Sequence, residues 1–370
     1  MTEGKGIRFD QSNHLQTITQ IHQGVWMKVL PFCLANVLNL YLVALAKKFI
    51  FHKKDDVGIS FNDFHLSSLS LVIAFLSVVR LSLSFADYKG QRASVQSMTR
   101  ACRNVVFHSV AFTRDDNGLK AKQWRLDIAR ESMALLRLLV TALHFKTAGK
   151  DKKMSMALSK EENAIIEANI GDDTDRSAYV IIMFLQTTIS SHQKHILIKH
   201  GEHYALKLYS FVEDYIKAYN ECYEMLDSGL PFPVIQMSRT LVFLYVYSLP
   251  WVIYDGEHSD FGFYPAMLYT LFVTYAFVGL EYVSIEMTDP FGDGENALNI
   301  LDVVEKVFKD IIMCIEGCDG EENAGVLKNY ATLMNDIEIE YDESTRSSKI
   351  LLNSSIRNES LRSGGYNSIV

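Results

Sequence analysis

The sequence predicts an all-α protein with four transmembrane helices and a cytosolic helical domain. Its 370 residues are 48% hydrophobic, which is more apolar than one soluble domain requires. Only 6 Pro and 20 Gly interrupt the chain, so long windows are free to form helices. The period-two alternation that is typical of strands is rare. Long apolar runs beside long amphipathic ones therefore favour membrane helices joined to water-exposed helices.

The stretch 66–92 is the most informative segment. Residues 66–79 carry no charge and are apolar around the whole helix, so this part belongs in a protein core or a bilayer. From Arg80 the periodic pattern continues through charged residues to Arg92, as expected for a helix that leaves a membrane. Its roughly 16 uncharged residues fall short of the ~20 that cross the hydrocarbon, so a soluble core helix explains this stretch equally well. The other apolar runs favour the membrane.

Three further apolar runs complete a set of four spans. The first run, 24–46, begins near Trp26, an aromatic residue suited to the membrane interface, and is interrupted by Lys28. Runs at 231–254 and 261–280 are separated by an acidic turn. The four spans therefore form two hairpins.

Arg239 lies inside the third apolar run, where a charge is costly unless it is paired. A carboxylate on the fourth span is the natural partner, and Glu281 and Glu286 are the two candidates. We expect this pair to have a structural role.

Six parts make up the predicted organisation. Basic residues follow the second span, and the turn between the third and fourth spans is acidic. These charges place both termini in the cytosol, although the lysines between the first two spans oppose this orientation. Two alternatives are left open for the tail, which is either disordered or docked on the protein as a regulatory segment. The parts are 1–23, a cytosolic segment; 24–92, the first hairpin; 93–230, a cytosolic helical domain; 231–288, the second hairpin; 289–337, further cytosolic helices; and 338–370, the tail.

Several functional classes are excluded by composition and motifs. The net charge of −8, with no basic face, argues against a nucleic-acid partner. Phosphate-binding loops, zinc-protease motifs and nucleophile elbows are missing from the sequence, so we do not expect an enzyme. Five scattered cysteines indicate reduced thiols. The histidines between 192 and 203 have the spacing of a helix face but not the second shell of carboxylates that orients metal ligands, which favours surface or pore-vestibule positions over a metal site. We therefore expect no metal and no cofactor.

Three sequence blocks resemble the bestrophin family, in the branch found in bacteria, plants and other non-animal eukaryotes. Residues 281–296 resemble its E-x-x-DPFG-x-x-x-N signature, and 231–250 resemble its PFPYxxxxHRT…LP segment. Residues 80–92 resemble its FRNNxSYDRWWEAR stretch. The blocks follow one another in the family's order between about 24 and 300. The matching motif residues are Arg80, Arg92, Arg239, Glu286, Asp289, Pro290, Phe291, Gly292 and Asn296.

This resemblance implies a homopentameric anion channel, with chloride or bicarbonate as the permeant ion and the second span lining a central pore. It places an apolar neck of the pore at four residues one helical turn apart, which are Phe64, Ser68, Val72 and Leu76. The register of this row along the helix is open to a shift of one residue. A hydrophobic constriction gates by dewetting, so Ser68 should make this neck wetter. A bicarbonate-conducting channel and a non-conducting membrane scaffold are the alternatives. An integral, multi-pass position is implied, in the plasma membrane or an organelle membrane such as the thylakoid.

Two other features bear on the implied channel. Animal bestrophins follow the PFG motif with an acidic run that binds calcium, whereas Asp293 and Glu295 are the two carboxylates here. Since calcium prefers six to eight oxygens, we do not expect a calcium clasp.

In a pentamer, the lysines of the first hairpin loop either anchor the helix ends at the headgroups or form a cationic vestibule at the pore mouth. These lysines are Lys47, Lys48, Lys53 and Lys54.

Overall fold

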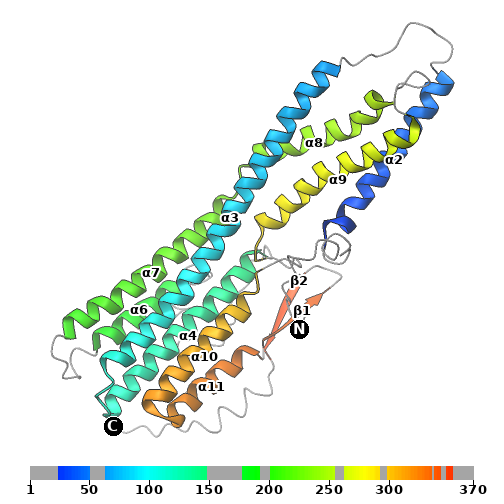
Figure 1. Cartoon of the computed structure of the whole chain (residues 1–370). Coiled ribbons are helices and arrows are strands. Elements are labelled where there is room, and N and C mark those ends of the chain that lie inside the picture. Colours follow the sequence, from blue (N-terminus) through cyan, green and yellow to red (C-terminus); the bar gives the residue numbers. More distant parts are fainter. Residues whose placement is uncertain are drawn as a thin grey trace. The chain divides into compact units, whose positions relative to one another are not determined.

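The computed structural model describes residues 24–50, 63–147, 177–191, 201–254, 262–291, 298–335, 337–342 and 347–352. This part of the chain is helical apart from one hairpin (Figure 1), so the all-α prediction is confirmed. The hairpin joins antiparallel strands β1 (Ile337–Asp342) and β2 (Ser347–Leu352), with Ile337 opposite Leu352. The helices are α2 (Val25–Ile50), α3 (Asp63–Phe112), α4 (Leu119–Thr147), α6 (Ser177–Ser191), α7 (Gly201–Ser228), α8 (Phe232–Ile253), α9 (Phe263–Thr288), α10 (Ile300–Asp319) and α11 (Glu321–Asn335).

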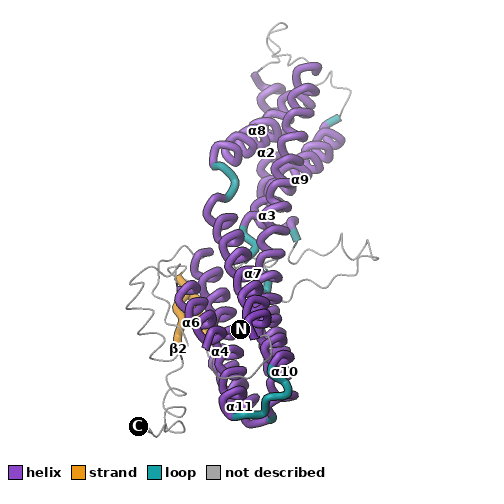
Figure 2. Tube along the Cα trace, turned by 90° about the vertical axis from the view of Figure 1, so that its left-hand side faces the viewer, coloured by secondary structure: helices purple, strands orange, loops and turns teal. Residues whose placement is uncertain are grey.

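The chain divides into two compact units. One, here called the membrane unit, contains α2, α3 as far as Arg92, and the chain from Tyr223 to Leu298, which includes α8 and α9. The other, the helical unit, contains the rest of α3 and α7 together with α4, α6, α10, α11 and the hairpin. The tube view in Figure 2 shows that helix dominates both units.

The membrane unit contains the helices suited to a bilayer. Within the described ranges, α2, α3 and α9 are each long and apolar enough to cross a membrane. The third predicted span, α8, meets the same criterion only together with α7, from which it is bent by 50°. The bend has a local cause, because Gly229 adopts a positive φ and Pro231 begins the next helix at its N-cap.

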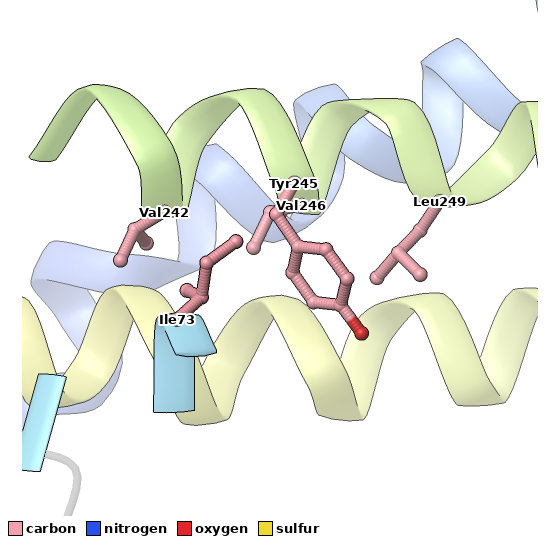
Figure 3. Close-up of a cluster of buried hydrophobic side chains, with 5 residues drawn as sticks. All are labelled: Ile73, Val242, Tyr245, Val246 and Leu249. Atoms are coloured by element: carbon pink, nitrogen blue, oxygen red, sulfur yellow. The ribbon is translucent and has the colours of Figure 1, made fainter. Parts of the chain in front are cut away.

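Apolar contacts hold the membrane unit together. Helix α2 packs against α8 and α9, and α8 packs against α9. Figure 3 shows Ile73 of α3 inserted beside a row of α8 side chains, which are Val242, Tyr245, Val246 and Leu249. A second buried cluster joins Val29 and Cys33 of α2 to Val278 of α9.

The helical unit has its own core, in which α4 packs against α6, α10 and α11. Helix α10 begins at Asn299, whose side chain accepts a hydrogen bond from the backbone N–H of Asp302 at 3.1 Å. It ends at Gly320, which has φ 89° and whose N–H donates to the carbonyl of Glu316 at 3.1 Å. These caps place the end of α10 where it meets a buried arginine of α4.

That arginine, Arg125, is completely buried and joins three parts of the helical unit. Its Nε donates to Asp319 Oδ2 of α10 at 2.9 Å. Its Nη1 donates to the carbonyls of Thr113 and Asp116, at 2.8 and 3.1 Å, in the turn between α3 and α4. A fully satisfied buried charge of this kind fixes the turn and the end of α10 relative to each other.

Candidate functional site

Helix α3 presents two chemically different faces within the membrane unit. The inner face is buried and becomes polar along its length, with Ile73 followed by Ser77, Arg80 and Ser84 at spacings of three or four residues. The outer face is apolar and exposed on the subunit. Its exposed fractions are 72% for Leu71, 52% for Val72, 66% for Phe75 and 54% for Val78. Such a face requires a bilayer, another subunit or a pore beside it.

An ion triad with two buried members anchors the inner face. The carboxylate Oε1 of Glu281 in α9 accepts from Arg239 Nε of α8 at 2.7 Å and also from Arg80 Nη1 of α3. Arg80 and Glu281 are 3% and 6% exposed, whereas Arg239 is 44% exposed. The expected partnership of Arg239 with a carboxylate of the fourth span is therefore confirmed, and Glu281 is the partner. We name this cluster the α3–α8–α9 triad.

The second carboxylate considered for Arg239 makes a different contact. Glu286 of α9 forms an ion pair with Lys28 of α2. The two side chains are partly exposed, which reduces the free energy that the pair contributes. Lys28, which interrupts the first apolar run, is thereby neutralised by a neighbouring span.

An amide network crosses the apolar helices of the membrane unit. Asn36 of α2 is fully buried and donates through Nδ2 to the carbonyl of Val246 at 2.9 Å and to Thr274 Oγ1 at 2.8 Å. Asn39 donates to the carbonyl of Tyr247 at 2.9 Å. Sequence reasoning missed this network. The signal was available, because two amides three residues apart in an apolar run must find partners when water is excluded.

The signature residues after the fourth span end the helix and turn the chain. Asp289 is the C-cap of α9, and Pro290, which cannot continue a helix, follows it. Pro290 and Phe291 are buried, and the Pro290 carbonyl accepts from the N–H of Leu298 at 2.7 Å. Gly292, Asn296 and the carboxylates considered for a calcium clasp lie outside the described residues.

The predicted neck residues lie on α3, where Val72 is exposed and Leu76 is half-buried. The side chains of Phe64 and Ser68 lie outside the described part. Arg92, further along α3, is exposed.

The lysines at the end of α2 divide between an anchored and an exposed position. Lys47 donates to the carbonyl of Tyr254, the C-cap of α8, and to that of Trp251 at 3.4 Å. A cation is stabilised there because the carbonyls at a helix C-terminus carry partial negative charge. Lys48 is exposed, and Lys53 and Lys54 lie outside the described residues.

Among the described residues, no three His, Cys, Asp or Glu side chains lie close enough together to hold a metal ion. The five cysteines, all within this part, are free thiols. Of the four predicted histidines, His203 is exposed on α7, and His192, His195 and His200 fall outside it.

Paired charges inside long apolar helices define this protein as a helical, multi-pass integral membrane protein. The family model for the bacterial and fungal bestrophin proteins matches residues 7–312, and the chain therefore belongs to the bestrophin family. This is a family of membrane anion channels and not of enzymes. The three sequence blocks had identified the same family.

Solved structures agree on the fold. Two crystal structures of single-residue variants of a bacterial bestrophin homologue from Klebsiella pneumoniae match with a TM-score of 0.65 and 18% identity. They cover 78% of this chain and 98% and 99% of the homologue. A third crystal structure of that homologue matches with a TM-score of 0.63 and 17% identity, covering 76% and 97%. Comparison with curated proteins found no match.

Proposed function

We propose that this chain forms a homopentameric channel that conducts chloride passively through a central pore lined by α3. The observation that carries the proposal is the division of α3 into a charged inner face and an apolar outer face. The triad holds the inner face to α8 and α9 of the same subunit. The outer face is left for contact with the pore, with neighbouring subunits and with lipid.

Five copies of one α3 residue around an axis form a ring. A small change in the size of that side chain is therefore repeated in all five subunits and changes the width of the pore from every side. Apolar rings of this kind resist wetting and so limit the current. We propose Val72 and Leu76 as successive rings of the neck. Leu71 and Phe75 form the alternative register, one residue earlier, and they are the two most exposed of the four.

Single-channel recording of the purified protein in planar bilayers tests the neck. We expect Val72→Ala combined with Leu76→Ala to raise the open-channel current, because the smaller rings are wider and wet more easily. Leu71→Ala combined with Phe75→Ala tests the alternative register. Leu38→Ala combined with Leu42→Ala, at exposed positions on α2, is the matched control and should leave the current unchanged.

Equal changes in all three double variants would contradict a neck on α3. The absence of current from wild-type protein that is folded and pentameric by mass measurement in detergent would instead favour a membrane scaffold.

The permeant ion is tested in the same recordings. Under a chloride gradient, a chloride channel moves its reversal potential toward the chloride equilibrium value. Replacement of chloride by bicarbonate on one side then measures the relative permeability of the two ions. A bicarbonate permeability well above that of chloride would reassign the substrate while leaving the pore unchanged.

A further inference from the structure

Three buried polar atoms around the triad have no hydrogen-bond partner in the described structure. They are Arg80 Nε and Ser84 Oγ on α3 and Ser238 Oγ on α8. Arg80 is 3% exposed, Ser84 is fully buried and Ser238 is 3% exposed. A buried polar group without a partner costs free energy, so each of these atoms is a candidate contact for a bound ligand.

Other serines in the same helices differ from these two. Ser77 of α3 donates to the carbonyl of Ile73 at 2.9 Å, and Ser248 of α8 donates to that of Tyr245 at 2.9 Å. This bond to the preceding turn is the usual way for a helix to satisfy a hydroxyl in an apolar environment. Ser84 and Ser238 do not make it, so their hydroxyls remain available to something else.

The contacts of α3 and α8 place these residues within about one helical turn of the arginines of the triad. Ile73 packs against the part of α8 from Val242 to Leu249, while Arg80 contacts the same carboxylate oxygen as Arg239. The two helices therefore run in opposite directions. Ser238 precedes Arg239 by one residue, and Ser84 lies one helical turn beyond Arg80 on the same buried face.

The charge and donor chemistry of this place select an anion. Two guanidinium groups share one carboxylate, which leaves one excess positive charge in the triad. The guanidinium Nε–H is a donor, and each serine hydroxyl has a proton to donate. Arg80 is 3% exposed and shares Glu281 with the 44% exposed Arg239, so the buried guanidinium is only partly neutralised; an anion beside it supplies opposite charge, which a water molecule does not.

We propose that a small monovalent anion of halide size binds between Arg80, Ser84 and Ser238. This site is held within one subunit on the inner face of α3, and it is distinct from the proposed pore on the outer face. Its occupant neutralises the triad and so stabilises the membrane unit. The proposal holds equally for a channel that conducts and for one that does not.

Thermal unfolding of the full-length protein in detergent tests this site. Chloride replaces gluconate at constant ionic strength, and bromide then replaces chloride. A ligand that binds only the folded state raises its stability with the logarithm of ligand concentration above Kd. We expect the wild-type midpoint to rise in this way with both halides.

Ser84→Ala combined with Ser238→Ala removes two donors with almost no change in volume. We expect this variant to lose at least half of the halide-dependent shift while remaining folded in gluconate. Ser82→Ala, at an exposed position of the same helix, is the matched control and should keep the whole shift. Crystals grown in bromide should show an anomalous peak beside Arg80 in wild type that is missing from the double variant.

Two results would overturn the proposal. The first is a wild-type midpoint that is identical in chloride and gluconate, as expected if water alone fills the site. The second is an undiminished shift in the double variant, which would place the stabilising halide elsewhere. Neither result depends on current, so both are separate from a failure of the proposed channel function.

Discussion

Replacing Glu281 by Gln removes the carboxylate that holds Arg80 and Arg239 in the triad. Arg80 is 3% exposed and loses its ionic partner, whereas Arg239 is 44% exposed and remains partly solvated. Removing one partner of a buried ion pair costs about 3–5 kcal/mol, because the other charge stays buried without compensation. Most of this cost is therefore expected to come from Arg80.

The expected change is large enough to measure by thermal unfolding in detergent. With an unfolding entropy of about 2 cal/mol/K per residue, a loss of ~4 kcal/mol lowers the midpoint of a 370-residue chain by about 5 °C. Glu286→Gln is the matched control on the same helix. Its partner Lys28 is 45% exposed, so we expect a loss of at most ~1 kcal/mol and a midpoint shift of about 1 °C.

A double variant separates the ion pair from general damage to the helix. Arg80→Gln combined with Glu281→Gln leaves no unpaired charge at the buried positions, so it should be more stable than the sum of the two single losses predicts. Equal destabilisation by Glu281→Gln and Glu286→Gln, or strict additivity in the double variant, would refute the assignment of the triad as the anchor of α3.

The remaining predictions concern the helical unit and the pore mouth. Arg125→Met should lower the unfolding free energy by ~3–5 kcal/mol in denaturant titrations, because Asp319 stays buried without its partner. The control Lys306→Met, at an exposed ion pair, should lower it by less than ~1 kcal/mol. Similar losses of unfolding free energy in the two variants would contradict a structural role for the buried pair. Burial raises the pKa of the Cys314 thiol to about 11, with Cys318 and Asp319 adding to the shift. Only about one thiol in a thousand is then ionised at pH 8, so alkylation followed by mass spectrometry should accelerate about tenfold per pH unit up to pH 10, and a rate that levels off by pH 9 would disagree. Lys53→Gln combined with Lys54→Gln should lower single-channel conductance at low salt and have little effect at physiological salt, where charges are screened over about 8 Å. A conductance that differs from wild type by the same amount at both salt concentrations, or not at all, would indicate that these lysines act as membrane anchors.

The position of the membrane helices could be predicted from the sequence because the information is local. Apolar residues on every face of a helix exclude water wherever the helix lies, so the runs that became α2, α3, α8 and α9 were recognisable one at a time. The start of α8 was equally local, since Pro231 breaks a helix through its own ring and its missing N–H. The sequence also required a carboxylate for Arg239, because a charge among apolar spans needs compensation.

The choice of that carboxylate was decided by the tertiary structure. Glu281 and Glu286 are five residues apart on one helix and so point in different directions, and only the packing of α9 against its neighbours decides which one meets Arg239. Arg80 reaches the same oxygen from 201 positions away in the chain. No periodicity encodes such a meeting.

The sequence by itself determined the class of the protein, its apolar spans and the chemical needs of its buried groups, because these follow from residue type and helical spacing. The tertiary structure alone decided how those needs were met. It joined Asn36 to Thr274, Lys28 to Glu286, and Arg80 and Arg239 to one carboxylate. It also left Ser84 and Ser238 buried without partners, because partner choice depends on which helix faces pack together, and packing is a property of the whole unit.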